Sequence, residues 1–164
     1  MNLFGAATQT IAITGSHVPC LEAGSARIEG RLGLLRSTVE TGPVSPFHRD
    51  VTALSLTRAH VTGGVVLNGA ELTAPEGWAM AAGGLVAEGG VFCRYGFVAQ
   101  GEVRLLGAQL PGGLFMQGAR LEGPGPRGVA LALDNATAST LNFSVGFTAN
   151  GTVRLRGARV SGTT

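Results

Sequence analysis

The sequence predicts an all-β fold, a single-domain β-helix (β-solenoid) with about 22 residues in each turn. Three observations lead to this prediction. A motif of about eleven residues recurs from one end of the chain to the other. The first half of each copy alternates apolar residues with others, which is the period of a β-strand. No long stretch has the i, i+3, i+4, i+7 spacing of an amphipathic helix, so the copies are expected to stack as strands of one coil.

The clearest copies of the repeat lie 50 residues apart, where residues 103–110 read VRLLGAQL and residues 153–160 read VRLRGARV. The same frame of apolar, any, apolar, any, Gly, Ala, any, apolar returns in VVLNGAEL at 65–72 and in LFMQGARL at 114–121. Copies with a relaxed frame begin at residues 11, 21, 32, 54, 91, 131 and 141, and degraded copies are expected near residues 43 and 79. Two copies make one turn, and about six turns stacked ~4.8 Å apart give a rod roughly 30 Å long.

The first, third and eighth residues of a copy are expected to point inward, because alternate residues of a strand face opposite sides. Leu105 and Leu155 then belong to one internal column, and the small sixth residue, such as Ala108, points inward where the coil is narrow. Residues 11–164 are expected to form the β-solenoid domain, and residues 1–10 an N-terminal cap. Proline-bearing insertions predict loops at 41–50, 73–77 and 122–128.

Two blocks, GFVAQGEVRLLGAQLPGG at 96–113 and GFTANGTVRLRGARVSG at 146–162, resemble a repeat of bacterial β-helical proteins often labelled membrane-associated oxidoreductase. They are more distantly similar to pentapeptide-repeat proteins. The resemblance implies that the β-helix is right-handed. A left-handed helix of hexapeptide repeats is the main rival fold, and its period of six fits the copies worse than eleven. The sequence shows no residues for redox chemistry, because it lacks a Gly-x-Gly-x-x-Gly turn between strand and helix and a Cys-x-x-Cys motif.

The composition indicates one compact domain, with a formal net charge of +2, 45% hydrophobic residues and 13% charged residues. All twelve basic side chains are Arg, a bias typical of GC-rich bacterial genomes. The small net charge argues against an extended nucleic-acid interface. Polar residues or Gly interrupt every apolar run well before the roughly 18 residues of a transmembrane helix, and the start lacks a secretory signal. A cytoplasmic location is therefore expected.

Three polar residues, His17, Thr38 and His60, occupy the seventh position of their copies and are expected to share one outward face. This face is either a binding surface or an ordinary solvated surface. His17 and His60 are expected about two turns apart, roughly 10 Å, which is too far to share a metal without another ligand. We therefore assign no catalytic, cofactor-binding or metal-ligating residues. Cys20 and Cys93 are expected about three turns apart, beyond the reach of a disulfide, with Cys93 in the core.

Two further groups of residues are candidate contacts. A basic group near the C-terminal end could bind anionic groups or form a solvated edge, and it consists of Arg104, Arg154, Arg156 and Arg159. An apolar stripe is expected on the outward side of alternate copies, made of Val66, Phe92 and Phe115 at the second position and of Phe97 and Phe147 at the seventh. Such a stripe marks an interaction surface unless a loop or a terminal segment covers it.

These features favour a non-enzymatic scaffold that acts through self-assembly or protein binding. The last full copy ends at Val160, and nothing in the sequence resembles a cap for the open coil there. The expected partner is a second copy of the chain, as a homo-oligomer or an end-to-end polymer, or another protein. The alternative is a ligand-binding or enzymatic module that uses the face of His17, Thr38 and His60.

Overall fold

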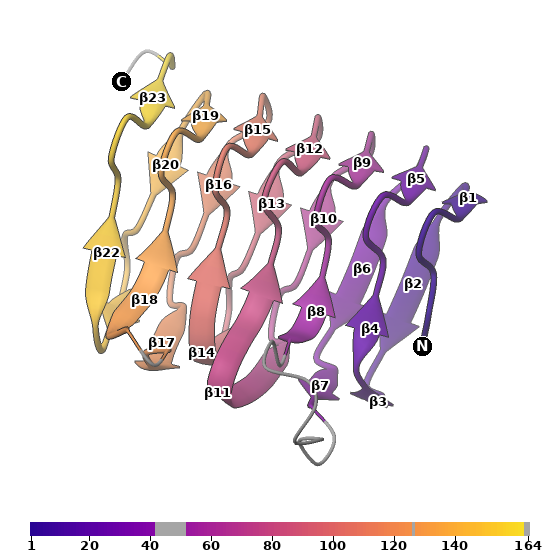
Figure 1. Cartoon of the computed structure of the whole chain (residues 1–164), viewed down its shortest axis with the longest axis horizontal. Coiled ribbons are helices and arrows are strands. Elements are labelled where there is room, and N and C mark those ends of the chain that lie inside the picture. The colour runs from indigo at the N-terminus through magenta and orange to yellow at the C-terminus, as the bar shows by residue number, and fades with distance from the viewer. Residues whose placement is uncertain (42–51, 126, 163–164) are drawn as a thin grey trace.

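The computed structural model describes residues 1–41, 52–125 and 127–162. Over these residues the protein is all-β, with 23 strands, β1 to β23, and no helix. All strand pairs are parallel, and the strands stack along the long axis of the molecule from the N-terminal to the C-terminal end (Figure 1). The prediction of an all-β fold built from stacked repeats is confirmed. None of the described residues forms a helix that is long and apolar enough to cross a membrane.

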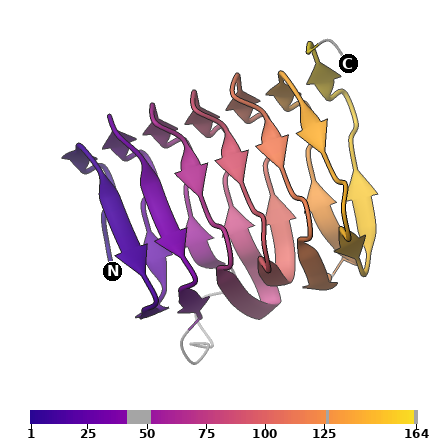
Figure 2. The ribbon, with the colours of Figure 1, turned by 180° about the vertical axis from the view of Figure 1, so that it is seen from behind.

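The strands form three sheets, and each turn of the chain contributes to all three. The first sheet consists of β1 (Ala7–Thr8), β5 (Arg27–Ile28), β9 (His60–Val61), β12 (Val86–Ala87), β15 (Gln109–Leu110), β19 (Thr137–Ala138) and β23 (Arg159–Val160). The second sheet consists of β2 (Ile11–Thr14), β6 (Leu32–Leu35), β10 (Val65–Val66), β13 (Val91–Phe92), β16 (Leu114–Phe115) and β20 (Leu141–Asn142). Figure 2 views the molecule from behind, so that this second sheet faces the reader.

The third sheet is bent around a corner of the coil. One row consists of β3 (His17–Pro19), β7 (Thr38–Glu40), β11 (Glu71–Ala81), β14 (Val98–Arg104), β17 (Arg120–Gly123) and β21 (Thr148–Ala149). The long strands β11 and β14 continue into a second row with β4 (Leu21–Glu22), β8 (Thr52–Ser55), β18 (Val129–Ala132) and β22 (Thr152–Arg154). Figure 1 shows β11 curving around this corner.

The residue pairing between turns agrees with the predicted length of a turn. Ile11 pairs with Leu32, which is 21 residues later, and Thr137 pairs with Arg159, which is 22 residues later. The turn from Arg27 to His60 is longer, at 33 residues, because it contains the segment 42–51. The degraded copy expected near residue 43 lies outside the described residues.

The interior consists of apolar columns that run along the coil. Leu105 is fully buried, because the turns before and after it pack against it. The columns include the paired residues Leu54, Met80, Val103, Leu131 and Val153. Parallel strands that are stacked in this way place identical positions of the repeat on top of one another, so each side chain is buried by its neighbours in the column.

The corner between the first and second sheets needs glycine. A Cβ atom on Gly89 would lie 2.6 Å from the carbonyl carbon of Gly63, one turn earlier. Real Cβ atoms do not approach backbone so closely, which explains the Gly-Gly pairs that mark this corner in successive turns. The turns can therefore stack at the spacing of hydrogen-bonded strands.

Two of the predicted insertion loops, at 73–77 and at 122–128, compare differently with the structure. The prediction of a loop at 73–77 is wrong, because these residues belong to β11. A register shift between Thr73 and Trp78 absorbs the extra residues as an irregularity of the strand, and a bulge of this kind tolerates Pro75. The loop predicted at 122–128 begins near its expected place, since β17 ends at Gly123 and β18 begins at Val129.

The N-terminal residues 1–10 add a rung to the coil. Asn2 forms a parallel bridge with Glu22, and β1 is the outermost strand of the first sheet. Leu3 packs against the core, whereas Phe4 is 66% exposed.

Candidate functional site

The aromatic row is the first candidate surface, and we define it as Val66, Phe92 and Phe115. These three side chains lie in register on the outward side of β10, β13 and β16, and all three are half-buried. The rings of Phe92 and Phe115 are stacked, with centroids 5.1 Å apart and an interplanar angle of 5°. The row continues to Asn142 in β20 and thus ends in a polar residue.

Arg94 adds a charge to this row. Its guanidinium carbon lies 4.9 Å from the ring centroid of Phe92 and 4.9 Å from that of Tyr95. Cation–π contacts of this kind contribute about 0.5–1 kcal/mol at exposed sites. Because Phe92 already stacks on Phe115 and contacts Arg94, its ring is largely engaged within the protein. Tyr95 is 71% exposed and is the part of this surface that is most open to a partner.

The prediction that Phe97 belongs to the outward stripe is wrong, because Phe97 is fully buried. Val98 pairs with Glu71, so Phe97 takes the inward position that Ala70 holds one turn earlier. The corner Tyr95–Gly96 holds one residue more than the corner of that earlier turn, and both of its residues have positive φ. A shift of one residue moves the following side chains to the opposite face of a strand.

Phe147 is displaced in the same way. Thr148 pairs with Arg120, so Phe147 stands in the inward column of Ala119. It packs against the core and against Phe143, with ring centroids 5.0 Å apart. The outward stripe is therefore shorter than predicted.

The single polar face predicted from His17, Thr38 and His60 does not form. His17 pairs with Thr38 in the third sheet, as neighbours on β3 and β7. His60 lies on β9 in the first sheet, where it pairs with Arg27 and Val86. The copy that begins at residue 54 is in register with the copy at 21, not with those at 11 and 32, so its seventh residue belongs to the other half of the turn.

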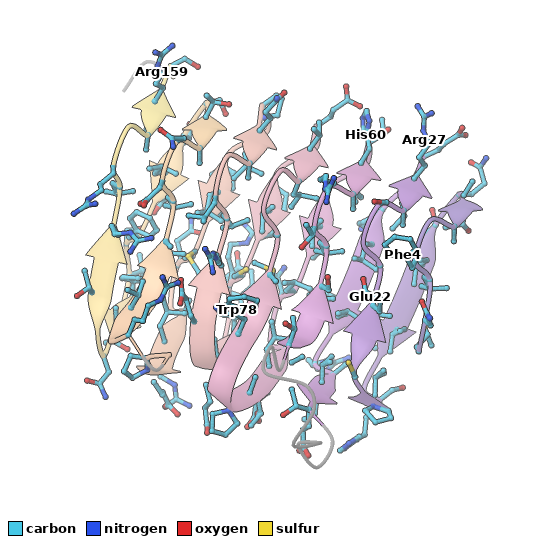
Figure 3. The ribbon with its side chains drawn as sticks, in the orientation of Figure 1. Phe4, Glu22, Arg27, His60, Trp78 and Arg159 are labelled. Carbon is cyan, nitrogen blue, oxygen red and sulfur yellow. The ribbon has the colours of Figure 1, made fainter. Side chains whose placement is uncertain are left out.

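His60 lies beside a small polar groove on the first sheet. Its Nε2 atom lies 3.2 Å from Oε2 of Glu88, and both side chains are exposed. The hydrogen bond from His60, helped by Thr62, holds the pKa of Glu88 below its ordinary value. The groove is lined by Arg27, Ile28, Glu29, His60 and Thr62. Figure 3 shows Arg27 and His60 projecting from neighbouring strands at the same edge.

The groove brings acids and bases together in roughly equal number. Gln9 donates a hydrogen bond to Glu29 at 3.0 Å, so this carboxylate also has a partner. Among the described residues, no group of three or more His, Cys, Asp or Glu side chains is placed to hold a metal ion. The surface therefore holds one exposed pair of His60 and Glu88, and an exposed pair of this kind usually adds little to stability.

The four candidate arginines do not form one patch. Arg104 lies over the ring of Trp78, with its guanidinium carbon 4.9 Å from the ring centroid. Arg154 lies in the same column two turns later, with Ala132 between them. Its Nε is 2.8 Å from Oδ2 of Asp134, although the N–H is not aligned for a hydrogen bond.

Arg156 and Arg159 are exposed in the last turn of the coil. Figure 3 shows Arg159 projecting at the C-terminal end. With Arg154 they make this end of the molecule basic.

Sequence reasoning missed Glu102 and Trp78. Glu102 is only 1% exposed, and its Oε1 atom makes no hydrogen bond to the residues that the structure describes. Its Oε2 atom lies 3.8 Å from a guanidinium nitrogen of Arg127. Glu102 pairs in register with Trp78, which directly follows the loop predicted at 73–77. No sequence signal marks Glu102 as buried, because its cover comes from the segment around Gly125 in the next turn.

The two cysteines are free. Cys93 is buried in the core as predicted, and burial raises the pKa of its thiol to about 12. Cys20 is exposed. A catalytic thiol requires a lowered pKa, and the pKa of Cys93 is shifted in the opposite direction.

The two end turns show the most distinctive surface property. Among the residues that the structure describes, eight apolar side chains pack against the core but stay partly exposed, and all eight lie in the first or last turn. They are Leu3, Ile11 and Ile13 at the N-terminal end, and Leu141, Phe143, Phe147, Ala149 and Val153 at the C-terminal end.

Comparisons with protein-family models, with curated proteins and with solved structures find no match to this chain.

Proposed function

We propose that this chain is a non-enzymatic scaffold, a right-handed β-helix that acts through self-assembly at its open end turns. The resemblance of residues 96–113 and 146–162 to bacterial β-helical repeats supports the handedness. An experimental structure tests the handedness directly, and a left-handed coil overturns it.

The observation that carries the proposal is the exposure of the core at its two ends. Leu133 is fully buried, whereas Leu155, which lies one turn later in the same column, is 45% exposed. Val160 is 51% exposed, although its column neighbour Ala138 is buried. Apolar surface of this kind favours association, at roughly 25 cal/mol per Å² of area removed from water.

The strand edges at the two ends add a second driving force. β1 and β23 are the outermost strands of the first sheet, and each has one neighbour in it among the described strands. An outermost strand presents unpaired backbone donors and acceptors, which readily pair with another chain. Apolar side chains and backbone groups thus favour the same contact.

Fewer observations support the rival proposal of a ligand-binding or enzymatic module. His17 and His60 lie on different sheets, so they do not converge on one site. The groove beside His60 is open, and two of its lining side chains already have partners, since His60 contacts Glu88 and Glu29 accepts a hydrogen bond from Gln9. This groove supports only weak, solvent-screened contacts with a ligand.

Light scattering coupled to gel filtration tests the scaffold proposal, from micromolar to millimolar concentration. We expect the mean molar mass to rise with concentration. Leu155→Asp places a charge in the exposed core column and should lower the mass at every concentration. Thr152→Asp is the matched control, because Thr152 is exposed in β22 of the same turn. A wild-type chain that stays monomeric throughout this range overturns the proposal.

A further inference from the structure

We infer that the copies assemble head to tail, so that the assembly has a polarity: the C-terminal turn of one copy docks on the N-terminal turn of the next. This inference rests on the proposed self-assembly and specifies which surfaces meet. The alternatives are contacts between two C-terminal turns or between two N-terminal turns. Charge, strand direction and the distribution of exposed apolar side chains bear on the choice.

The charge distribution opposes contact between two C-terminal turns. Residues 135–162 contain three Arg and no Asp or Glu. Only Arg154 has an acidic neighbour, Asp134, while Arg156 and Arg159 make no ion pair with the residues that the structure describes. Two such ends face to face would bring like charges together at short range, which is unfavourable.

The N-terminal turn lacks this excess of positive charge. Residues 1–26 contain one acidic residue, Glu22, and no Arg or Lys. The N-terminal amine donates a hydrogen bond to the carbonyl oxygen of Cys20 at 2.7 Å, so its charge is held within the first turn. A basic C-terminal turn can therefore be covered by an N-terminal turn without the repulsion that a second basic turn imposes.

Strand direction favours the same arrangement. Every strand pair in the described part of the chain is parallel, from β1 with β5 to β19 with β23. A head-to-tail contact continues the parallel pairing and the apolar columns into the next copy. Two like ends that face each other reverse the strand direction and break the column pattern.

Both turns supply exposed apolar side chains for this contact. Ile11 and Ile13 alternate with exposed residues on β2, so their side chains lie on the core side of the first turn. At the other end, Leu155 and Val160 continue the columns of the buried residues Leu133 and Ala138, and they are 45% and 51% exposed. The contact therefore buries apolar surface from each copy, and it leaves one end of each type free for further growth.

A mixing experiment with two end-blocked variants tests the polarity. Ile13→Asp blocks the N-terminal turn, and Leu155→Asp blocks the C-terminal turn. We expect each variant alone to be monomeric by light scattering, and an equimolar mixture to form a dimer of one copy of each. The dimer cannot grow, because its two outer ends are blocked. Weakening at each blocked contact should raise the apparent Kd by at least about tenfold.

Matched controls separate blocking from misfolding. Thr14→Asp and Thr152→Asp place the same charge on exposed positions of β2 and β22, in the same two end turns, and should assemble like the wild type. Circular dichroism checks that every variant keeps its β-structure. If Ile13→Asp fails to fold, Leu3→Asp replaces it, because Leu3 is also a partly exposed core residue of the first turn.

The outcomes distinguish the two proposals. Assembly of the wild type without a mixed dimer overturns the polarity and leaves the scaffold proposal standing. Dimerisation of one blocked variant with itself shows that two like ends meet, and it also overturns the polarity. A wild-type chain that never assembles overturns the scaffold proposal itself.

Discussion

Leu105 and Leu155 occupy the same internal column two turns apart, and only Leu105 is fully buried, while Leu155 is 45% exposed. Both residues hold the third position of the repeat, in VRLLGAQL and VRLRGARV. Their sequence environments are nearly identical. The difference arises because Leu105 has a turn packed on each side, whereas Leu155 has a described turn on one side only.

This pair predicts a position-dependent cost of truncation. Leu105→Ala should lower the free energy of unfolding by about 2–5 kcal/mol, because it removes buried surface and leaves a cavity. Leu155→Ala should cost clearly less, since its side chain keeps about half of its contact with water. Urea unfolding followed by circular dichroism measures both. Equal losses would show that Leu155 is covered in solution, and repeating the measurement at low protein concentration identifies assembly as the cover.

A second prediction concerns the corner between the first and second sheets. Gly89→Ala should destabilise the protein by about 1–3 kcal/mol, because its Cβ would lie 2.6 Å from the backbone of Gly63 and force the turns apart. Gly107→Ala is the matched control, since a Cβ there meets nothing within 4 Å but its φ of +64° is strained. The control should cost about 1 kcal/mol. Thermal or urea unfolding compares the two, and a larger loss at Gly107 contradicts the close packing of the corner.

The contact between His60 and Glu88 predicts that the stability of the fold depends on pH. The hydrogen bond from His60 lowers the pKa of Glu88 in the folded protein. A lowered folded-state pKa stabilises the fold above the ordinary pKa of a glutamate, and the contribution is lost as the pH falls through the lowered value. NMR titration should show the lowered pKa of Glu88 returning towards 4.5 in His60→Ala. An unchanged titration of Glu88 in this variant excludes His60 as the cause.

The two thiols should differ in reactivity. Cys20 is exposed, whereas burial raises the pKa of Cys93 to about 12, so at pH 8 Cys93 is both protonated and covered. We expect a thiol reagent to label one cysteine in the native protein and both in denaturant. Cys20→Ser should abolish native labelling. Rapid native labelling of Cys93 would show that the coil opens at β13 far more readily than its burial indicates.

The repeat allowed most of the fold to be predicted from sequence. Alternation within each copy identifies the strands, and the recurring aliphatic positions identify the core, because parallel strands stack identical positions on one another. The buried Leu105 and Cys93 follow from this rule. The aromatic row of Val66, Phe92 and Phe115 follows from it as well, since copies of the same kind remain in register.

The candidate sites were harder to predict because they depend on the phase of each copy, that is, on which half of a turn the copy occupies and on which of its side chains face outward. One additional residue at the corner Tyr95–Gly96 turns Phe97 from the outer face into the core. The length of the segment between β7 and β8 hides which half of a turn the copy at residue 54 belongs to, and so the repeat pattern wrongly groups His60 with His17. Phase errors of this kind change which side chains meet without changing the number or type of strands.

The sequence by itself determined that this protein is a stack of short parallel strands around an aliphatic core, because a strand with one apolar face is stable only when neighbouring copies cover it. Only the tertiary structure decided which copies lie above one another, that Glu102 is buried beneath the next turn, and that the core is least covered at the two end turns. The physical reason is that burial in a coil depends on the neighbouring turns, and corner insertions too small to disturb the repeat determine how those turns align.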